Sequence, residues 1–231
     1  MFVRATTATR AGVLALALVA FAACGSDDSS SGVTAPDDDT EADGGATDPA
    51  CPPEGGAAQQ TRTFDAPPPT CLEPGATYQA VVTTNKGEFT ITLYPESAPV
   101  AANNFAFLAG HLYFDGTECH RIIPDFVVQC GDPTATGSGG PGYTIVDEPA
   151  PRAYELGSVA MAKTPAPDSA GSQFFIITGA NGTALPPEYA LFGQVTDGFD
   201  TTVAAMAAAG TPGAGVPSEE IVIESVRIVA D

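Results

Sequence analysis

The residues best suited to chemistry lie in one stretch of the chain, CHRIIPDFVVQCGDPTATGSGGPGY, which runs from Cys119 to Tyr143. Inside an acidic chain, this stretch holds an isolated arginine, Arg121, and a side-chain amide, Gln129, among apolar side chains. A guanidinium and an amide beside apolar surface suit the binding of a neutral amide next to a small apolar ring. The binding of an anion fits this set of groups less well.

Arg121 and Gln129 act together only if a hairpin brings them to one face of a sheet. Strand residues two apart share a face, so Arg121 lies with Ile123, and Gln129 lies with Val127. A three-residue loop at 124–126 then places Arg121 opposite Gln129 and Ile123 opposite Val127. This register groups a guanidinium, an amide and apolar surface on one side of the hairpin, and we favour it.

A two-residue turn would set a different register. It would place Cys119 opposite Cys130, ready for a disulfide, and would separate Arg121 from Gln129. Both features hold together only if a bulge, for example at Gly131, rotates the strand locally. The sequence therefore does not decide whether Cys119 and Cys130 form a disulfide.

The sequence pattern of the rest of the domain predicts the strands and helices that position this hairpin. Residues 78–94 form two β-rich runs around Asn-Lys-Gly, which indicates a hairpin. We expect helices at 97–111, with Ser97 as a possible cap and Pro99 in the first turn, and at 199–209. Further short strands are expected at 118–123, 127–131, 157–162, 173–178, 190–195 and 221–230. We predict a mainly β fold, a closed eight-stranded antiparallel β-barrel capped by two α-helices.

The stretch 119–143 and the later GSQFFI, Gly171–Ile176, resemble the signature segments of cyclophilin-type peptidyl-prolyl cis-trans isomerases. The resemblance covers nearly all of residues 77–231 and implies a cyclophilin-like fold that isomerises X-Pro bonds. In the family, the arginine that matches Arg121 is the main catalytic residue, and Gln129 and Phe126 accompany it. The resemblance also implies a substrate-binding set: Val127, Ala162, Lys163, Gln173, Phe175, Leu185 and Tyr189.

Five positions depart from the family pattern. Val127 is smaller than the usual Met or Phe, and Cys130 replaces a usual Gly. Lys163 occupies the place of a common Asn, Tyr189 that of a histidine, and Ala184 that of the tryptophan that contacts the drug cyclosporin. These changes bear on cyclosporin affinity more than on catalysis. They also leave an alternative open, a non-catalytic proline-peptide binding module or chaperone at the cell surface.

A second alternative concerns Arg121 itself. An arginine between acidic neighbours is often one half of a structural ion pair, and Arg121 has three such neighbours in the sequence: Glu118, Asp125 and Asp132. In that case the guanidinium would not be available to a substrate.

Composition excludes several other partners. The formal net charge is −20 with only 8 Lys and Arg, so we expect no nucleic-acid partner. The segment TGSGGPGY, 136–143, lacks the Gly-Lys-Ser/Thr ending of a phosphate-binding loop, and His111 and His120 are the only histidines. We predict no metal and no cofactor, since isomerisation makes and breaks no covalent bond. We expect a monomer that acts on proline-containing polypeptides.

The N-terminus predicts export. Arg4 and Arg10 precede an apolar run at 12–23 that is too short to span a membrane, so residues 1–23 are typical of a signal peptide. The sequence Phe21-Ala22-Ala23-Cys24 resembles a bacterial lipoprotein processing site. We therefore expect Cys24 to be lipidated and to anchor the protein to the outer face of the cytoplasmic membrane. The alternative is an ordinary secretory signal and a secreted protein.

Residues 24–76 differ in composition from the domain that follows. The part up to about residue 60 is acidic and nearly free of large apolar side chains, which predicts a disordered tether. Residues 62–75 are rich in proline and predict a loop that a Cys51–Cys71 disulfide staples and that lies against the domain. Four cysteines remain for disulfides in an oxidising compartment, and proximity favours 51–71 with 119–130: Cys51, Cys71, Cys119 and Cys130. The domain proper is expected at 77–231.

Overall fold

Alternating apolar residues build the sheet of this protein. In β1 (Tyr78–Thr84) every second side chain is buried, and the computed structural model, which describes residues 49–230, shows the same alternation through most of β2 (Gly87–Leu93). The turn at Asn85-Lys86 joins them, as the sequence predicted. The expected signal peptide at 1–23, the lipidation site Cys24 and the first part of the expected tether lie outside the described residues.

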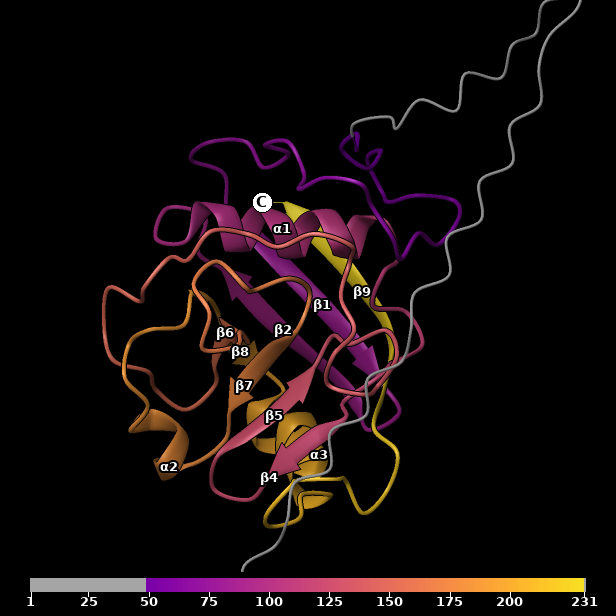
Figure 1. Cartoon of the computed structure of the whole chain (residues 1–231). Coiled ribbons are helices and arrows are strands. Elements are labelled where there is room, and N and C mark those ends of the chain that lie inside the picture. Colours follow the sequence, from indigo (N-terminus) through magenta and orange to yellow (C-terminus); the bar gives the residue numbers. More distant parts are fainter. Residues whose placement is uncertain (1–48, 231) are drawn as a thin grey trace, which may run out of the picture. The chain divides into compact units, whose positions relative to one another are not determined.

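The remaining strands complete one antiparallel sheet (Figure 1). They are β3 (Thr117–Glu118), β4 (Arg121–Ile123), β5 (Val127–Cys130), β6 (Ser158–Met161), β7 (Phe174–Ile177), β8 (Leu191–Asp197) and β9 (Val222–Ala230). The strands follow the order β3-β9-β1-β2-β8-β6-β7-β5-β4. The site is thus built at the β6-β7-β5-β4 end of the sheet.

The prediction of a closed eight-stranded barrel is wrong, because the structure has a nine-stranded half-barrel whose end strands are β3 and β4. The single strand expected at 118–123 is divided into two short strands. β3 pairs with β9 and β4 pairs with β5, so Cys119 and His120 lie between two strands that have different partners. No regular ladder joins β3 to β4 in the described sheet, which therefore has two ends.

The helices are α1 (Pro99–Gly110), α2 (Ala180–Thr183), the π-helix η1 (Phe199–Val203) and α3 (Ala204–Ala208). α1 occupies the expected position with Pro99 at its start, but Ser97 does not cap it. The Glu148 carboxylate does so from a distant loop, accepting the N–H groups of Val100 and Ala101 at 2.9 and 2.8 Å. The expected second helix consists of η1 followed by α3, and α2 was not predicted, so two capping helices are too few.

The main core lies between α1 and the sheet. Phe105 of α1 contacts three buried aromatic rings, with centroids at 5.0 Å from Phe114, 5.3 Å from Phe174 and 5.0 Å from Phe192. All four phenylalanines are at most 1% exposed. Aromatic packing of this kind fixes the β7 and β8 strands relative to α1.

Residues 49–76, called the strap below, lie along α1 rather than forming a solvated tether over their whole length (Figure 1). The Ala57 and Thr61 amides donate to the Gly110 and His111 carbonyls, and the Asn103 side chain accepts the Cys71 amide at 2.7 Å. A disulfide joins Cys51 to Cys71 across the strap. Composition predicted a tether only up to about residue 60 and a stapled loop at 62–75. The order of the strap comes from hydrogen bonds to α1 and its following turn, together with the disulfide.

Candidate functional site

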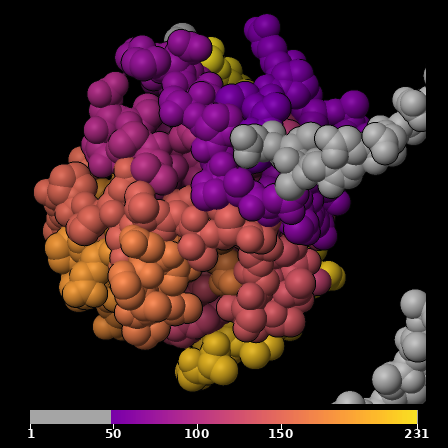
Figure 2. All heavy atoms as spheres, turned by 45° about the horizontal axis from the view of Figure 1, so that its top comes forward, coloured from indigo at the N-terminus to yellow at the C-terminus, as the bar shows by residue number. Residues whose placement is uncertain are grey.

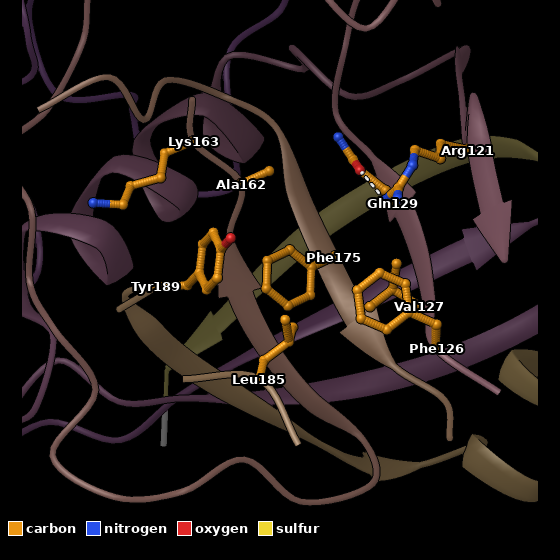
Figure 3. Close-up of a pocket in the computed structure, with 9 residues that line it drawn as sticks. All are labelled: Arg121, Phe126, Val127, Gln129, Ala162, Lys163, Phe175, Leu185 and Tyr189. Atoms are coloured by element: carbon orange, nitrogen blue, oxygen red, sulfur yellow. Dashed lines mark hydrogen bonds between the residues drawn. The ribbon is translucent and has the colours of Figure 1, made fainter. Parts of the chain in front are cut away.

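Nine of the predicted site residues line one small cavity of about 180 Å³ (Figure 3). They are Arg121, Phe126, Val127, Gln129, Ala162, Lys163, Phe175, Leu185 and Tyr189. Gln173 is the predicted residue that does not line it; Gln173 lies in an adjoining cavity. Pockets for drug-sized ligands measure ~300–1,000 Å³, so this cavity suits a single side chain or ring.

The β4–β5 hairpin has the register that places Arg121 opposite Gln129 and Ile123 opposite Val127. The chain turns through residues 124–126, where Asp125 adopts a positive φ of 56°. The Asp125 carboxylate accepts the Ala180 amide at 2.8 Å and the Asn181 side-chain amide at 2.9 Å. The turn is therefore held against the start of α2, and it presents the Phe126 ring to the cavity.

The structure also contains a disulfide between Cys119 and Cys130. It coexists with the hairpin register because the alternation of side chains is interrupted beyond β4 and β5. Cys119 and His120 lie outside both β3 and β4, and Gly131 adopts a φ of +88°. A Cβ at Gly131 would lie 2.4 Å from the Ser172 carbonyl oxygen, so only glycine fits there. The disulfide and the Arg121–Gln129 register therefore coexist because the backbone is irregular at Gly131 and at the opposite residues 119–120.

Three side chains form a hydrogen-bonded relay that runs from the polar side of the cavity into the adjoining cavity. The Arg121 Nη1 donates to Gln129 Oε1 at 3.1 Å, and Gln129 Nε2 donates to Gln173 Oε1 at 3.0 Å. Gln173 Nε2 donates in turn to the carbonyls of Gly137 and Gly139, at 3.1 and 3.0 Å. The side-chain amides of Gln129 and Gln173 thus both accept a hydrogen bond from the Arg121 side of the relay. These bonds fix the position of the guanidinium.

Arg121 keeps its charge available. Within residues 49–230 it makes no ion pair with Glu118, Asp125 or Asp132, so the structural ion pair considered above is not present. Its Cζ lies 5.7 Å from the centroid of the Phe126 ring. The guanidinium therefore borders both an amide and an aromatic face, with donors left over for a ligand.

A buried carboxylate, Asp132, organises the loop on which the relay ends. It accepts the Thr134 amide and hydroxyl at 2.7 and 2.8 Å and the Gly139 amide at 3.0 Å. Burial alone would raise the pKa of Asp132, but these hydrogen bonds outweigh it and lower the pKa to about 2. The ionised carboxylate thus holds residues 134–139 in one conformation.

The apolar side of the cavity rises from the face of the sheet that points away from the main core. Val127, Ala160, Phe175, Ile177 and Leu191 form a second buried cluster there. The cluster draws on four neighbouring strands, β5 to β8, and its side chains follow the strand alternation. The walls above it are the partly buried Phe126, Leu185 and Tyr189.

Tyr154 fixes the outer wall of the cavity. Its hydroxyl donates to the Tyr189 carbonyl at 2.8 Å and accepts the Tyr189 amide at 2.9 Å. Tyr154 is 3% exposed, and burial raises its pKa to about 12. The Tyr189 ring then stands edge-on to Phe175, with centroids 5.4 Å apart.

A second cavity of about 380 Å³ adjoins the first and shares Gln129, Ala162 and Lys163 with it. Lys163 Nζ binds Asp147 Oδ2 at 2.6 Å, and the amine points away from Arg121 (Figure 3). This hydrogen bond raises the pKa of Lys163 and lowers that of Asp147. The Lys163 charge is therefore neutralised at the boundary between the cavities.

Sequence reasoning missed Asp125, Asp132 and Tyr154 as supports of the site. Asp125 had a signal, since a residue in a tight turn with a short polar side chain tolerates positive φ. Asp132 was considered only as an ion-pair partner for Arg121. Nothing local marks Tyr154, because its partner Tyr189 is distant in the chain.

Residues 49–230 lack two features. No three His, Cys, Asp or Glu side chains there gather as a metal ligand set requires. No helix in that range has the length and apolar character needed to cross a bilayer.

Comparison with known proteins places this fold and site in a family. The family model "Cyclophilin type peptidyl-prolyl cis-trans isomerase/CLD" matches residues 79–228. The probable peptidyl-prolyl cis-trans isomerase B of Mycobacterium leprae is 36% identical over 172 residues, which are 66% of this chain and 57% of the relative. The isomerase B of Bacillus subtilis is 45% identical over 118 residues, 50% of this chain and 80% of the relative. This chain thus spans a little over half the length of the first of these relatives.

Solved structures of cyclophilin-type isomerases also resemble this chain. A cyclophilin-type isomerase of Cryptosporidium parvum matches with a TM-score of 0.62 and 32% identity, covering 67% of this chain and 99% of that chain. A structure of the same protein in the presence of the dipeptide Ala-Pro gives a TM-score of 0.61 and 33% identity, covering 66% and 99% of the two chains. The chain therefore belongs to the cyclophilin-type peptidyl-prolyl cis-trans isomerase family.

Proposed function

We propose that this protein isomerises X-Pro peptide bonds in exported or cell-envelope polypeptides, with Arg121 as the catalytic group. The observation that carries the proposal is an arginine without an acidic partner in the described structure, fixed by Gln129 at the edge of a small apolar cavity. A neutral ring enters such a cavity, and the preceding carbonyl then lies within reach of polar donors. The Ala-Pro dipeptide, in whose presence the structure of the Cryptosporidium parvum relative was determined, carries a ring of this kind.

The chemistry required is electrostatic. Rotation about an X-Pro bond crosses a barrier of about 18–20 kcal/mol because amide resonance is lost in the twisted state. The proline nitrogen becomes more basic as resonance breaks, and a fixed guanidinium that donates to it stabilises the twisted state more than the planar one. One charge-assisted hydrogen bond contributes about 1.5–3 kcal/mol, or roughly ten- to a hundredfold in rate.

The apolar walls select the substrate side chain. Phe126, Val127, Phe175 and Leu185 surround the space next to Arg121, and they admit a proline ring but offer no partner to a charged side chain. Gln129 and Gln173 supply amide groups for the substrate backbone. The second cavity, which shares Gln129 with the first, accommodates neighbouring residues of an extended peptide.

A protease-coupled assay with a proline tetrapeptide tests the catalytic role of Arg121. Arg121→Ala should lower kcat/KM at least tenfold, and Arg121→Lys should recover only part of it because an ammonium lacks the planar fork. Wild-type activity in Arg121→Ala would refute the assignment. Val229→Leu, at a solvent-exposed position of β9, is the control and should leave kcat/KM unchanged.

A non-catalytic role, binding of proline segments by a module or chaperone, is the second candidate. Three residues favour it, because they replace residues that the resemblance leads one to expect: Lys163, Ala184 and Tyr189. An absence of isomerase activity in the wild type, together with retained binding of Ala-Pro peptides by calorimetry, would establish this candidate instead.

We further propose that the protein is exported and anchored by a lipid on Cys24 to the outer face of the cytoplasmic membrane. The signal-like residues 1–23 and the Phe21-Ala22-Ala23-Cys24 site support this location, and the two disulfides, one in the strap and one in the domain, suit an oxidising compartment. Metabolic labelling with a palmitate analogue should mark the wild type and not Cys24→Ser. Labelling that persists in Cys24→Ser would disprove the site.

A further inference from the structure

The relay from Arg121 ends on a loop that has little conformational preference of its own. Residues 137–142 read Gly-Ser-Gly-Gly-Pro-Gly, and the Gly137 and Gly139 carbonyls in this loop orient Gln173. Glycine loses more backbone freedom on folding than any other residue. The loop therefore holds Gln173 in place only if contacts from elsewhere in the chain fix it.

Asp132 supplies such a contact at one end, through the Gly139 amide. The strap supplies the contact at the other end. The Phe64 amide donates to the Pro141 carbonyl at 2.8 Å, and a Cβ at Gly142 would lie 2.5 Å from the Phe64 carbonyl oxygen. Figure 2 shows the strap (indigo) lying against the part of the chain around residues 130–150 (salmon). The strap backbone thus rests directly on the glycine-rich loop.

Phe64 is itself firmly anchored. Its ring is buried edge-on against Phe107 at 4.9 Å, with His111 at 5.3 Å and Tyr143 at 6.3 Å between centroids. The Cys51–Cys71 disulfide closes the strap around it. The main-chain groups of Phe64 are therefore presented to the loop from a rigid position on α1.

We propose that Phe64 is a positioning residue of the isomerase site. The strap holds residues 137–142 so that their carbonyls orient Gln173, and Gln173 orients Arg121 through Gln129. The strap lies outside residues 79–228, which the family model matches. The inference rests on the proposed catalytic function of Arg121.

Two variants break the contact from its two sides. Phe64→Ala removes the anchor of the strap, and Gly142→Ala places a methyl group against the Phe64 carbonyl. The matched controls are Asp65→Ala, at an exposed neighbour in the strap, and Gly75→Ala, which has a comparable positive φ of +79° but no atom within 4 Å of a Cβ. Phe64→Leu keeps an apolar anchor and should restore most of the activity.

The experiment measures kcat and KM on a proline tetrapeptide, the melting temperature, and the NMR signals of the Gln129 and Gln173 side-chain amides. Both disruptive variants should lower kcat roughly fivefold, the equivalent of one ordinary hydrogen bond, with KM nearly unchanged. The two glutamine signals should shift in these variants and not in the controls. Should Phe64→Ala not fold, Gly142→Ala carries the same comparison.

Two outcomes separate the inference from the function beneath it. A lower melting temperature with wild-type kcat and unshifted glutamine signals would mean that the strap only stabilises the fold, and the inference would be wrong. An inactive wild type would refute the proposed function of Arg121, and the NMR signals would still decide whether Phe64 positions the relay.

Discussion

The two sides of the cavity are held by different kinds of interaction. The floor of the apolar side consists of packed side chains on regular strands, such as Val127 and Phe175, and its outer walls come from loops. On the polar side, Arg121 and Gln129 also lie on strands, but their side chains are oriented through Gln173 by a glycine-rich loop, which contacts a buried carboxylate and the strap. Apolar packing tolerates small shifts, whereas a hydrogen-bonded relay loses its function when one member is displaced.

This difference separates two kinetic effects. The apolar walls bind the planar and the twisted substrate about equally, so changes there should appear in KM. The polar side interacts more strongly with the twisted state, so changes there should appear in kcat. Each variant below tests whether this division holds.

Asp132→Asn should have the largest effect. An amide offers one oxygen and two N–H groups where the carboxylate now accepts the Thr134 and Gly139 amides, so at least one buried donor loses its acceptor. We expect a loss of about 2–3 kcal/mol in the free energy of unfolding and a fall in kcat. Urea denaturation and the isomerase assay measure the two effects. An unchanged kcat would show that the loop does not contribute to catalysis through the polar side of the site.

The same residue predicts a pH dependence. The pKa of Asp132 is lowered from 3.8 to about 2, so its ionised form stabilises the folded state fully above about pH 4, and this contribution disappears as the pH falls toward 2. The wild type should therefore lose about 2 kcal/mol more than Asp132→Asn between about pH 5 and pH 2. Parallel stability curves for the two proteins would contradict the burial and hydrogen bonding of this carboxylate.

Tyr154→Phe tests the apolar side and should have a smaller effect. Without the hydroxyl, the amide and carbonyl of Tyr189 lose their partners, which costs about 1–2 kcal/mol. The Tyr189 wall is loosened, so KM should rise a few-fold while kcat stays constant. Tyr94→Phe is the matched control, because its hydroxyl makes no hydrogen bond within the described residues. A fall in kcat in Tyr154→Phe would break the proposed division.

Lys163→Met should have the smallest effect. The ion pair with Asp147 is partly exposed, with 18% and 22% of the two side chains accessible, and solvent screening leaves such pairs little effect on stability. Activity should remain within about twofold of the wild type, since the Lys163 amine does not take part in the relay. A loss of kcat comparable to that of Arg121→Ala would make Lys163 a member of the polar side.

The sequence by itself determined the local geometry of the site. Because side chains in a strand alternate, requiring Arg121, Val127 and Gln129 to share a face predicted the three-residue loop and the register that the structure shows. The two signature stretches identified the family, and the family model confirms it. Periodicity and motif depend only on neighbours in the chain, so they can be read without a structure.

Only the tertiary structure decided how the sheet ends and what holds the relay. The division of the strand at 118–123 depends on β9 and β5 competing for it from opposite sides, which no local pattern encodes. The first part of the strap, up to about residue 60, has the composition of a tether, and the order of the strap comes from distant partners such as Gly110 and Pro141. These contacts join residues far apart in sequence, and their free energy depends on positions that exist only after the chain has folded.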